Sequence, residues 1–282
     1  MKRTAGKRKR PVRKRPAAWP PIPEVRVRTW AQLHNELYAG SWRHPIGRFR
    51  SSFAFRGMQD ASSTLATALQ KLAPDPGGLE QPLLRNFRKF AQRSAVPEDS
   101  VWNWLALGQH HGLPTRLLDW TFSPYVALHF ATASTERFDR DAAVWVVDYG
   151  RAHALLPARL RTALRRDRAD VLTAEMLGSA ARSLTDFDRL ARRPFVAFFD
   201  PPSLDDRIVN QYALFSLLSS ATERLDDWLG AHPGLARRII IPGSLKWEVR
   251  DKLDQANLTE RVLFPGLDGL SRWLRRYYMP RS

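Results

Sequence analysis

The chain has 282 residues, of which 44% are hydrophobic and 11% aromatic, so it can bury a sizeable core and is typical of a globular protein. It contains no cysteine, which excludes disulfides, thiolate zinc sites and cysteine nucleophiles and favours a reducing, cytoplasmic location. No apolar run approaches the roughly 20 residues that a membrane span needs. The formal net charge of +17 favours polyanionic partners.

About half of the excess positive charge lies in the first 15 residues. This segment contains nine Lys or Arg and no acid, and removing it would lower the net charge from +17 to +8. The proline-rich residues 16–23 follow and are typical of an extended spacer. We therefore predict a disordered basic arm over residues 1–27 and a globular domain over residues 28–282. The arm either binds nucleic acid, which is compatible with association with the nucleoid, or only keeps the chain soluble. Its proposed nucleic-acid-binding residues are Lys7, Arg8, Lys9, Arg10, Arg13, Lys14 and Arg15.

Before residue 108, periodicity predicts several helices and one strand. The strand covers residues 52–56, where apolar and polar residues alternate before Gly57. Ser62 or Ser63 is expected to cap a helix, and the segment 74–78, rich in proline and glycine, is expected to form a loop. The predicted helices cover residues 30–38, 64–72, 81–92 and 100–107.

Residues 109–120 combine two histidines, an arginine, an aspartate and a tryptophan within twelve positions. A Gly-x-Pro turn separates the histidines from a predicted strand over residues 115–120. Ser123 at the N-cap and Pro124 at the first helical position then predict a helix. This much polar chemistry on a loop, a strand and a capped helix indicates a functional site.

The elements after this stretch do not alternate regularly between strand and helix. This favours an α+β domain, with a mixed or antiparallel sheet flanked by helices, over a doubly wound α/β domain. Strands are predicted over residues 142–147, 194–199, within 208–218 and over 237–241, and helices over 151–192 and in the segment 247–278.

Several motifs together resemble the FRG-domain family. Phe55-Arg56-Gly57 matches the Phe-Arg-Gly motif that gives the family its name, and residues 109–130 match its long central motif. Residues 211–215 resemble a later Gln-x-Gly-x-Phe motif, with Ala213 in place of the glycine, which we expect to affect packing rather than the strand itself. Residues 263–269 resemble the family's ending, so the resemblance covers roughly residues 28–276.

The chain also resembles the ADP-ribosyltransferases, which place an Arg-Gly pair on a first strand, a Ser/Thr-rich strand before a helix, and a Glu or Gln on a third strand. The corresponding positions are Arg56-Gly57, residues 115–121 with the helix at 127–130, and Gln211. This resemblance implies an ADP-ribosyltransferase-like fold with NAD as co-substrate. The chain departs from that pattern because it has neither Ser-Thr-Ser nor Glu-x-Glu.

Cleavage of NAD would break a glycosidic bond through an oxocarbenium-like transition state. The catalytic candidates are Asp119, to orient a hydroxyl or stabilise positive charge, His110 (or its neighbour His111) as acid and base, and Gln211, to bind a ribose hydroxyl. Arg56 would bind the pyrophosphate as a bidentate donor. The complete set of cofactor-binding candidates is Arg56, Gly57, Thr115, Arg116 and Trp120.

Each assignment has a structural alternative. Arg56 can pair with a structural carboxylate, Asp119 can cap the following helix or pair with a buried arginine, and Trp120 can pack beneath that helix. Because Arg116 and Asp119 lie three residues apart on the predicted strand, they point to opposite faces, and we expect one of them to face the site. No metal site is expected, since cysteine is absent and the histidines lack ligand spacing.

Two functions from different classes are compatible with these residues. The first is an ADP-ribosyltransferase that modifies DNA, RNA or a protein, consistent with a toxin or antiphage effector that an inhibitory partner silences. The second is a non-catalytic module that binds a nucleotide or a nucleic acid. The dense polar motif favours the enzyme, whereas the lack of an identifiable catalytic glutamate favours the module. Glu223 and Glu248 are carboxylates that folding could bring into the site. The oligomeric state is left open.

Overall fold

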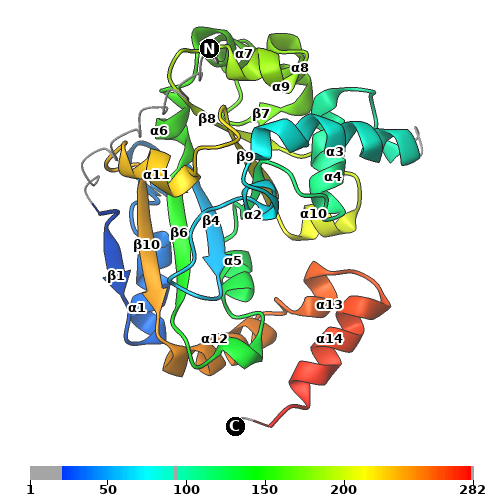
Figure 1. The fold of residues 1–282 in the computed structure, drawn as a ribbon. Coiled ribbons are helices and arrows are strands. Elements are labelled where there is room, and N and C mark those ends of the chain that lie inside the picture. Colours follow the sequence, from blue (N-terminus) through cyan, green and yellow to red (C-terminus); the bar gives the residue numbers. More distant parts are fainter. Residues whose placement is uncertain (1–20, 92–94, 281–282) are drawn as a thin grey trace, which may run out of the picture.

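The computed structural model describes residues 21–91 and 95–280. The seven proposed nucleic-acid-binding residues of the arm therefore lie outside the described residues. Eight strands of the described chain form one mixed sheet in the order β1-β10-β6-β4-β5-β9-β8-β7 (Figure 1). The outer pairs β1–β10 and β7–β8 are parallel, and the pairs between them are antiparallel. The strands are β1 (Glu24–Arg26), β4 (Phe53–Met58), β5 (Leu117–Thr121), β6 (Ala142–Asp148), β7 (Leu172–Thr173), β8 (Val196–Asp200), β9 (Ala213–Leu218) and β10 (Ala236–Ile241).

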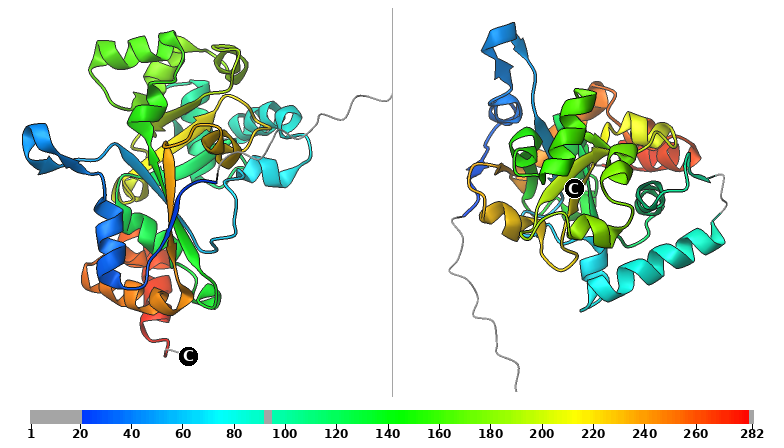
Figure 2. Two further views of the ribbon diagram at one scale, coloured as in Figure 1. Left: turned by 90° about the vertical axis from the view of Figure 1, so that its left-hand side faces the viewer. Right: turned by 90° about the horizontal axis from the view of Figure 1, so that it is seen from above.

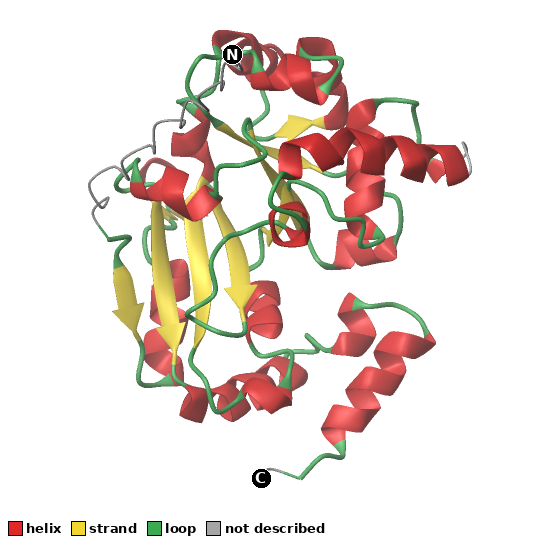
Figure 3. Cartoon of the chain, viewed as in Figure 1, coloured by secondary structure: helices red, strands yellow, loops and turns green. Residues whose placement is uncertain are grey.

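Helices flank the sheet, as the colouring of Figure 3 shows. Before β6 these are α1 (Trp30–Tyr38), α2 (Ala68–Leu72), α3 (Pro76–Phe90), α4 (Val101–His110) and α5 (Pro124–Ala131). After β6 they are α6 (Tyr149–His153), α7 (Ala158–Asp167), α8 (Ala174–Ala180), α9 (Leu184–Asp188), α10 (Asp206–Asn210), α11 (Leu225–Gly230), α12 (Lys246–Gln255), α13 (Glu260–Leu263) and α14 (Leu267–Tyr277). The predicted α+β class with a mixed sheet is therefore confirmed.

Alternation along the strands divides the core between the two faces of the sheet. In β6, Trp145 and Val147 join a cluster that also takes side chains from β5, β8 and β9 and from α6 and α11. Val144 and Val146 join a different cluster with α1, α5 and α12. A third cluster packs α4, α8 and α9 against β5, β8 and β9. Burial on both faces explains why β6 is a continuous apolar run in the sequence.

The two halves of the sheet meet at a weakly paired junction. β4 pairs with β6 over six positions but with β5 at only one, Phe55 with Thr121. β5 in turn pairs with β9 over residues 117–121. The strands β4 and β5, which carry the sequence motifs Phe55-Arg56-Gly57 and Leu117–Trp120, therefore lie side by side at the place where the sheet opens.

Several predicted elements need correction. The helix expected from residue 64 begins only at Ala68, because Thr67 and Gln70 form a capping box and residues 64–67 are not helical. The segment 74–78 is not a loop throughout: α3 begins at Pro76, with Pro at the first helical position and Asp75 accepting from the Gly78 N–H. The short strand β7 lies inside the region predicted to be helical.

The domain boundary at residue 28 is also placed too late. β1, at Glu24–Arg26, pairs in parallel with β10 and so belongs to the sheet. The sequence did not predict this three-residue strand, because prolines precede it and its pairing partner lies more than 200 residues away in the chain. Elsewhere α1 covers the predicted residues 30–38, and Ser100 and Ser123 cap α4 and α5 as expected.

Candidate functional site

A cavity of about 850 Å³ lies where β4 and β5 separate. It is lined by residues of these two strands, the loop after β4, the C-terminal end of α4 and the segment around α10. This volume falls within the range of ordinary small-molecule sites, roughly 300–1,000 Å³. Of the catalytic candidates, the structure brings Asp119, His110 and Gln211 to this one cavity, together with Arg56 and Gly57.

Arg56 and Asp119 face each other across the gap between the two strands. Arg56 donates to the Asp119 carbonyl oxygen, and its Nη1 lies 3.7 Å from the Asp119 carboxylate. The carboxylate also accepts from Gln109 Nε2 at 2.9 Å, and Thr115 donates to Gln109 Oε1 at 2.5 Å. Burial lowers the pKa of the Arg56 guanidinium, and the charge of Asp119 opposes this shift. Arg56, Gln109 and Thr115 thus fix the direction of the Asp119 carboxylate in the cavity.

His110 forms a second pair with a carboxylate. Its Nε2 lies 2.6 Å from Asp205 Oδ2, and only 9% of its side chain is exposed. The other Asp205 oxygen accepts from the Ile208 N–H and so caps α10. Burial opposes the charged form of Asp205, but the hydrogen bonds from Ile208 and His110 outweigh it and lower the carboxyl pKa. His111, the C-cap of α4, lies next to His110 and also lines the cavity.

Additional cations line the cavity that the sequence motifs did not indicate. These are Lys71 of α2, Arg137 after α5 and Arg207 of α10. The Nε atoms of Arg56 and Arg207 are buried, and neither has a hydrogen-bond partner among the described residues. The carboxylates that line the cavity among the described residues are those of Asp119 and Asp60. The excess of positive charge suits an anionic ligand.

Gly57 shapes the cavity wall through packing. A Cβ atom at this position would lie 1.9 Å from the Ala127 carbonyl oxygen and 2.5 Å from the Ala131 nitrogen, both in the backbone of α5. Only glycine therefore lets β4 approach α5 this closely. The glycine of the Phe-Arg-Gly motif is therefore explained by packing, because it leaves room for the backbone of α5.

Arg116 and Thr115 do not reach the cavity, so their assignment as cofactor-binding residues is corrected. Arg116 is buried and donates to the carboxylates of Glu80 and Asp188. Of the two charged residues on this segment, Asp119 is the one that faces the site. The hydroxyl of Thr115 is used locally, since it accepts from the Leu117 N–H and donates to Gln109.

Trp120 and Gln211 also differ from their expected roles. Trp120 is among the residues that line the cavity, but its indole is buried, donates to Ser216 and packs against Phe198, so the ring is held in the core and does not stand out into the cavity. Gln211 does line the cavity, but it is the C-cap of α10 and precedes β9 instead of lying on a strand. Its Nε2 donates to the Leu263 carbonyl oxygen at 2.8 Å.

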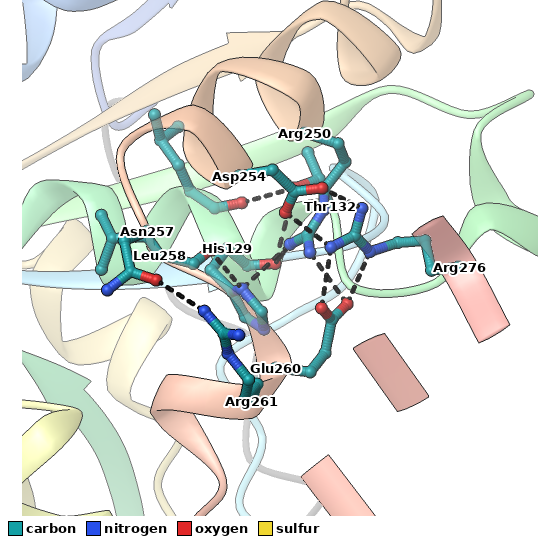
Figure 4. Close-up of polar contacts among 10 residues, drawn as sticks. His129, Thr132, Arg250, Asp254, Asn257, Leu258, Glu260, Arg261 and Arg276 are labelled. Atoms are coloured by element: carbon teal, nitrogen blue, oxygen red, sulfur yellow. Dashed lines mark hydrogen bonds and ion pairs between the residues drawn. The ribbon is translucent and has the colours of Figure 1, made fainter. Parts of the chain in front are cut away.

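The C-terminal helices support this side of the cavity. Phe264 packs against Phe130, which lines the cavity, and lies beneath the Arg207 guanidinium. A buried ion network anchors these helices, as Figure 4 shows. Arg276 of α14 donates to Asp254 and Glu260 at 2.6–2.8 Å. The network continues through Arg250, which donates to Glu260 and to His129 Nδ1, and so links α14 to α12 and α5.

No glutamate enters the cavity lining within the described residues. Glu223 lies at a different small pocket, and Glu248 pairs with Lys252 on the surface of α12. Among the described residues, no group of three or more His, Asp or Glu side chains is arranged to hold a metal ion. None of the described helices is long and apolar enough to cross a membrane.

Residues 51–140 match the family model of the FRG domain. The matched part is less than half of the chain, and it contains β4, α2 to α5, β5 and the Arg56–Asp119 pair. Arg207 and Gln211, which also line the cavity, lie after the matched residues, as does Asp205, the partner of His110. Comparisons with curated proteins and with solved structures found no match.

Proposed function

We propose that the cavity binds NAD and transfers its ADP-ribosyl group to an acceptor. The observation that carries this proposal is the convergence of Arg56, Lys71, Arg137 and Arg207 on a cavity that also holds an oriented carboxylate and a carboxylate-bound histidine. A dinucleotide presents a doubly charged pyrophosphate, which guanidinium groups bind bidentately. The unpartnered Nε atoms of Arg56 and Arg207 are donors for that group.

In the proposed reaction, the bond between ribose C1′ and the nicotinamide nitrogen breaks, and nicotinamide leaves with the bonding electron pair. The acceptor nucleophile forms the new bond to C1′ and gives up its proton. His110 takes that proton, with Asp205 behind it to stabilise the imidazolium. Asp119, held by Gln109, orients a ribose hydroxyl and stabilises the positive charge that develops on the ribose. Gln211 uses its side-chain oxygen Oε1 as a further acceptor for a ribose hydroxyl, while its Nε2 donates to Leu263.

The arrangement of elements supports an ADP-ribosyltransferase-like fold as part of this proposal. Arg56-Gly57 lies on a central strand, and β5 leads directly into α5, whose backbone packs on Gly57. The cavity opens where the sheet divides between β4 and β5. The position of Gln211 before β9 is the main departure from the three-strand pattern.

A non-catalytic nucleotide-binding module is the second candidate. It is favoured by the absence of a glutamate from the described cavity lining and by the Arg56 guanidinium, which partly neutralises Asp119. In that case the same cations hold a nucleotide or a nucleic-acid end, and no bond breaks.

Nicotinamide release separates the two functions. The purified protein is incubated with NAD, with and without DNA, RNA and cell lysate, and NAD binding is measured in parallel. Asp119→Asn should lower release at least about 100-fold and leave NAD binding within a few-fold. Asp206→Asn is the matched control, because Asp206 is exposed on α10 and lies outside the cavity lining. Folded protein that binds NAD without releasing nicotinamide supports the module, and folded protein that does neither contradicts the enzyme and any module whose ligand is NAD.

A further inference from the structure

A small hairpin stands away from the body of the molecule, as both views of Figure 2 show near residue 45. It consists of β2 (Trp42–Arg43), the 3-10 turn His44–Ile46 and β3 (Arg48–Phe49). All residues from 42 to 50 are exposed. This hairpin carries arginines at 43, 48 and 50, and its exposed apolar side chains are Trp42, Ile46 and Phe49.

The hairpin and α7 form the two sides of a groove of about 730 Å³. Arg43 and Arg50 line it from the hairpin side, and Arg161 and Arg165 line it from α7. Asp170 is the one carboxylate among the lining residues. Four arginines from two distant segments therefore meet at one concave surface, and such clustering is the footprint that phosphate binding requires.

None of these four arginines forms an ion pair with a carboxylate of the described chain. The Arg43 guanidinium is nevertheless held in place, because it donates to the Arg50 carbonyl oxygen at 3.0 Å and to Ser52 Oγ at 3.1 Å. On α7, Arg161 and Arg165 lie one turn apart, where two like charges destabilise a helix. This contrasts with Arg116 and Arg276, whose charges are neutralised by carboxylates. Charges kept close together without partners point to a ligand.

We propose that this groove binds the phosphate backbone of nucleic acid. The guanidinium fork matches phosphate geometry, and four such groups on two facing walls suit a polyanion with regularly spaced charges. The exposed tip Pro45-Ile46, flanked by arginines, resembles the apolar wedges that insert between base steps. The charges line a concave groove rather than a flat face, which favours a nucleic acid over an anionic membrane surface.

The groove is separate from the NAD cavity, so this proposal stands apart from the proposed reaction. Ser52 lines the groove and Gly57 lines the cavity, at opposite ends of β4. At the rise of an extended strand, these positions are about 17 Å apart. A nucleic acid in the groove therefore contacts a surface that variants of Asp119 or Arg56 leave intact.

The test measures binding of the full chain to a fluorescent duplex of about 20 base pairs, and to each single strand, over a range of salt concentrations. Arg161→Gln with Arg165→Gln should flatten the slope of log K against log salt by about 1.8, since each lost phosphate contact removes about 0.9. Arg85→Gln with Arg275→Gln is the control, because both arginines are exposed, lie outside the groove and form no ion pair with a residue that the structure describes. It makes the same change in net charge.

A flatter slope for the groove variant alone, with the slope of an Asp119→Asn variant unchanged, supports the proposal. A stronger loss for the duplex than for single strands assigns the groove to double-stranded nucleic acid, and the reverse assigns it to single strands. Equal slopes for the groove and control variants would overturn it. It would also be overturned if the groove variant lost binding to anionic phosphatidylglycerol vesicles while its binding to nucleic acid stayed normal. Circular dichroism establishes that each variant is folded.

Discussion

Gly57, the last residue of the Phe-Arg-Gly motif, lets strand β4 pack closely against helix α5. We expect Gly57→Ala to destabilise the protein by about 3 kcal/mol, because the added Cβ would overlap backbone atoms of α5 that have little freedom to move. The free energy of unfolding in urea measures this loss. Gly77→Ala is a suitable control, since its Cβ would lie 3.8 Å from the nearest atom, in a side chain, and alanine favours the helix. Equal stability of wild type and Gly57→Ala would rule out the close approach of β4 and α5.

Arg116 tests whether a motif residue serves the fold or the ligand. Its two carboxylate partners predict that Arg116→Met costs about 3–5 kcal/mol, because Glu80 is then left buried and charged without a partner. Adding Glu80→Met should recover part of that loss, which a double-mutant cycle in urea would show. NAD affinity of the folded single variant should equal that of wild type. A selective loss of NAD affinity without a change in stability would restore the ligand-binding assignment.

The ion network that joins helices α5, α12, α13 and α14 makes the free energy of unfolding depend on pH. Burial alone would raise the pKa of Glu260, but hydrogen bonds from Arg276 and the charge of Arg250 outweigh it and hold the pKa at about 2. An unfolded glutamate protonates near 4.5, so this contribution is complete above that pH and is lost as the pH falls towards 2. Burial also lowers the pKa of His129 to about 3, so the unfolded chain takes up a proton first and stability falls from pH 6.5 downwards.

We expect Glu260→Gln to cost about 3 kcal/mol at pH 7 and much less near pH 3. The reason is that below pH 4.5 the unfolded chain binds a proton at Glu260 while the folded protein, with a pKa of about 2, does not, so most of this stabilisation is lost by pH 3. Urea unfolding of both proteins at pH 7, 5 and 3 measures the convergence. Glu136→Gln, at an exposed residue without an ion pair, should track wild type throughout. A constant difference between wild type and Glu260→Gln would contradict the role of the charge.

Local signals predicted the elements well where caps and periodicity agree. Ser100 and Ser123 mark α4 and α5, and the apolar run of β6 is a strand. The errors lie where pairing is non-local. β1 and β7 have only three and two residues, and each exists because a distant strand accepts it in parallel. No pattern within such short segments distinguishes them from a spacer or a helix cap.

The sequence indicated some of the residues that line the cavity and missed those that come from distant segments of the chain. Phe55-Arg56-Gly57 and residues 109–120 were prominent because chemically active residues stand close together in the chain. Lys71, Arg137 and Arg207 reach the cavity from separate segments, and nothing local distinguishes them from surface charges. The sequence predicted that only one of Arg116 and Asp119 faces the site, but β5 begins after Arg116, so strand alternation is not what separates them; burial and the cavity lining identify Asp119.

The basic arm at residues 1–15 is expected to act on the whole molecule, because electrostatic attraction is long-range. Deleting residues 1–15 removes nine positive charges, and we expect this to weaken binding to nucleic acid and to flatten its salt dependence by several units of slope. Titration of a labelled duplex at 50–200 mM salt, against full-length protein, measures the change. An unaltered slope would show that the arm does not contact phosphate.

Strands β4 and β5 pair at a single position, so the backbone amides at their junction are expected to open more easily than those of the rest of the sheet. Two strand edges face each other inside the molecule, so amide groups along this junction have fewer partners than those of β6, which is paired over six positions on each side. Native-state hydrogen–deuterium exchange should therefore be fast along the junction and slow in β6. A molecule that occupies the cavity would shield the junction amides, so their exchange rates would report occupancy for any compound, before its chemistry is known.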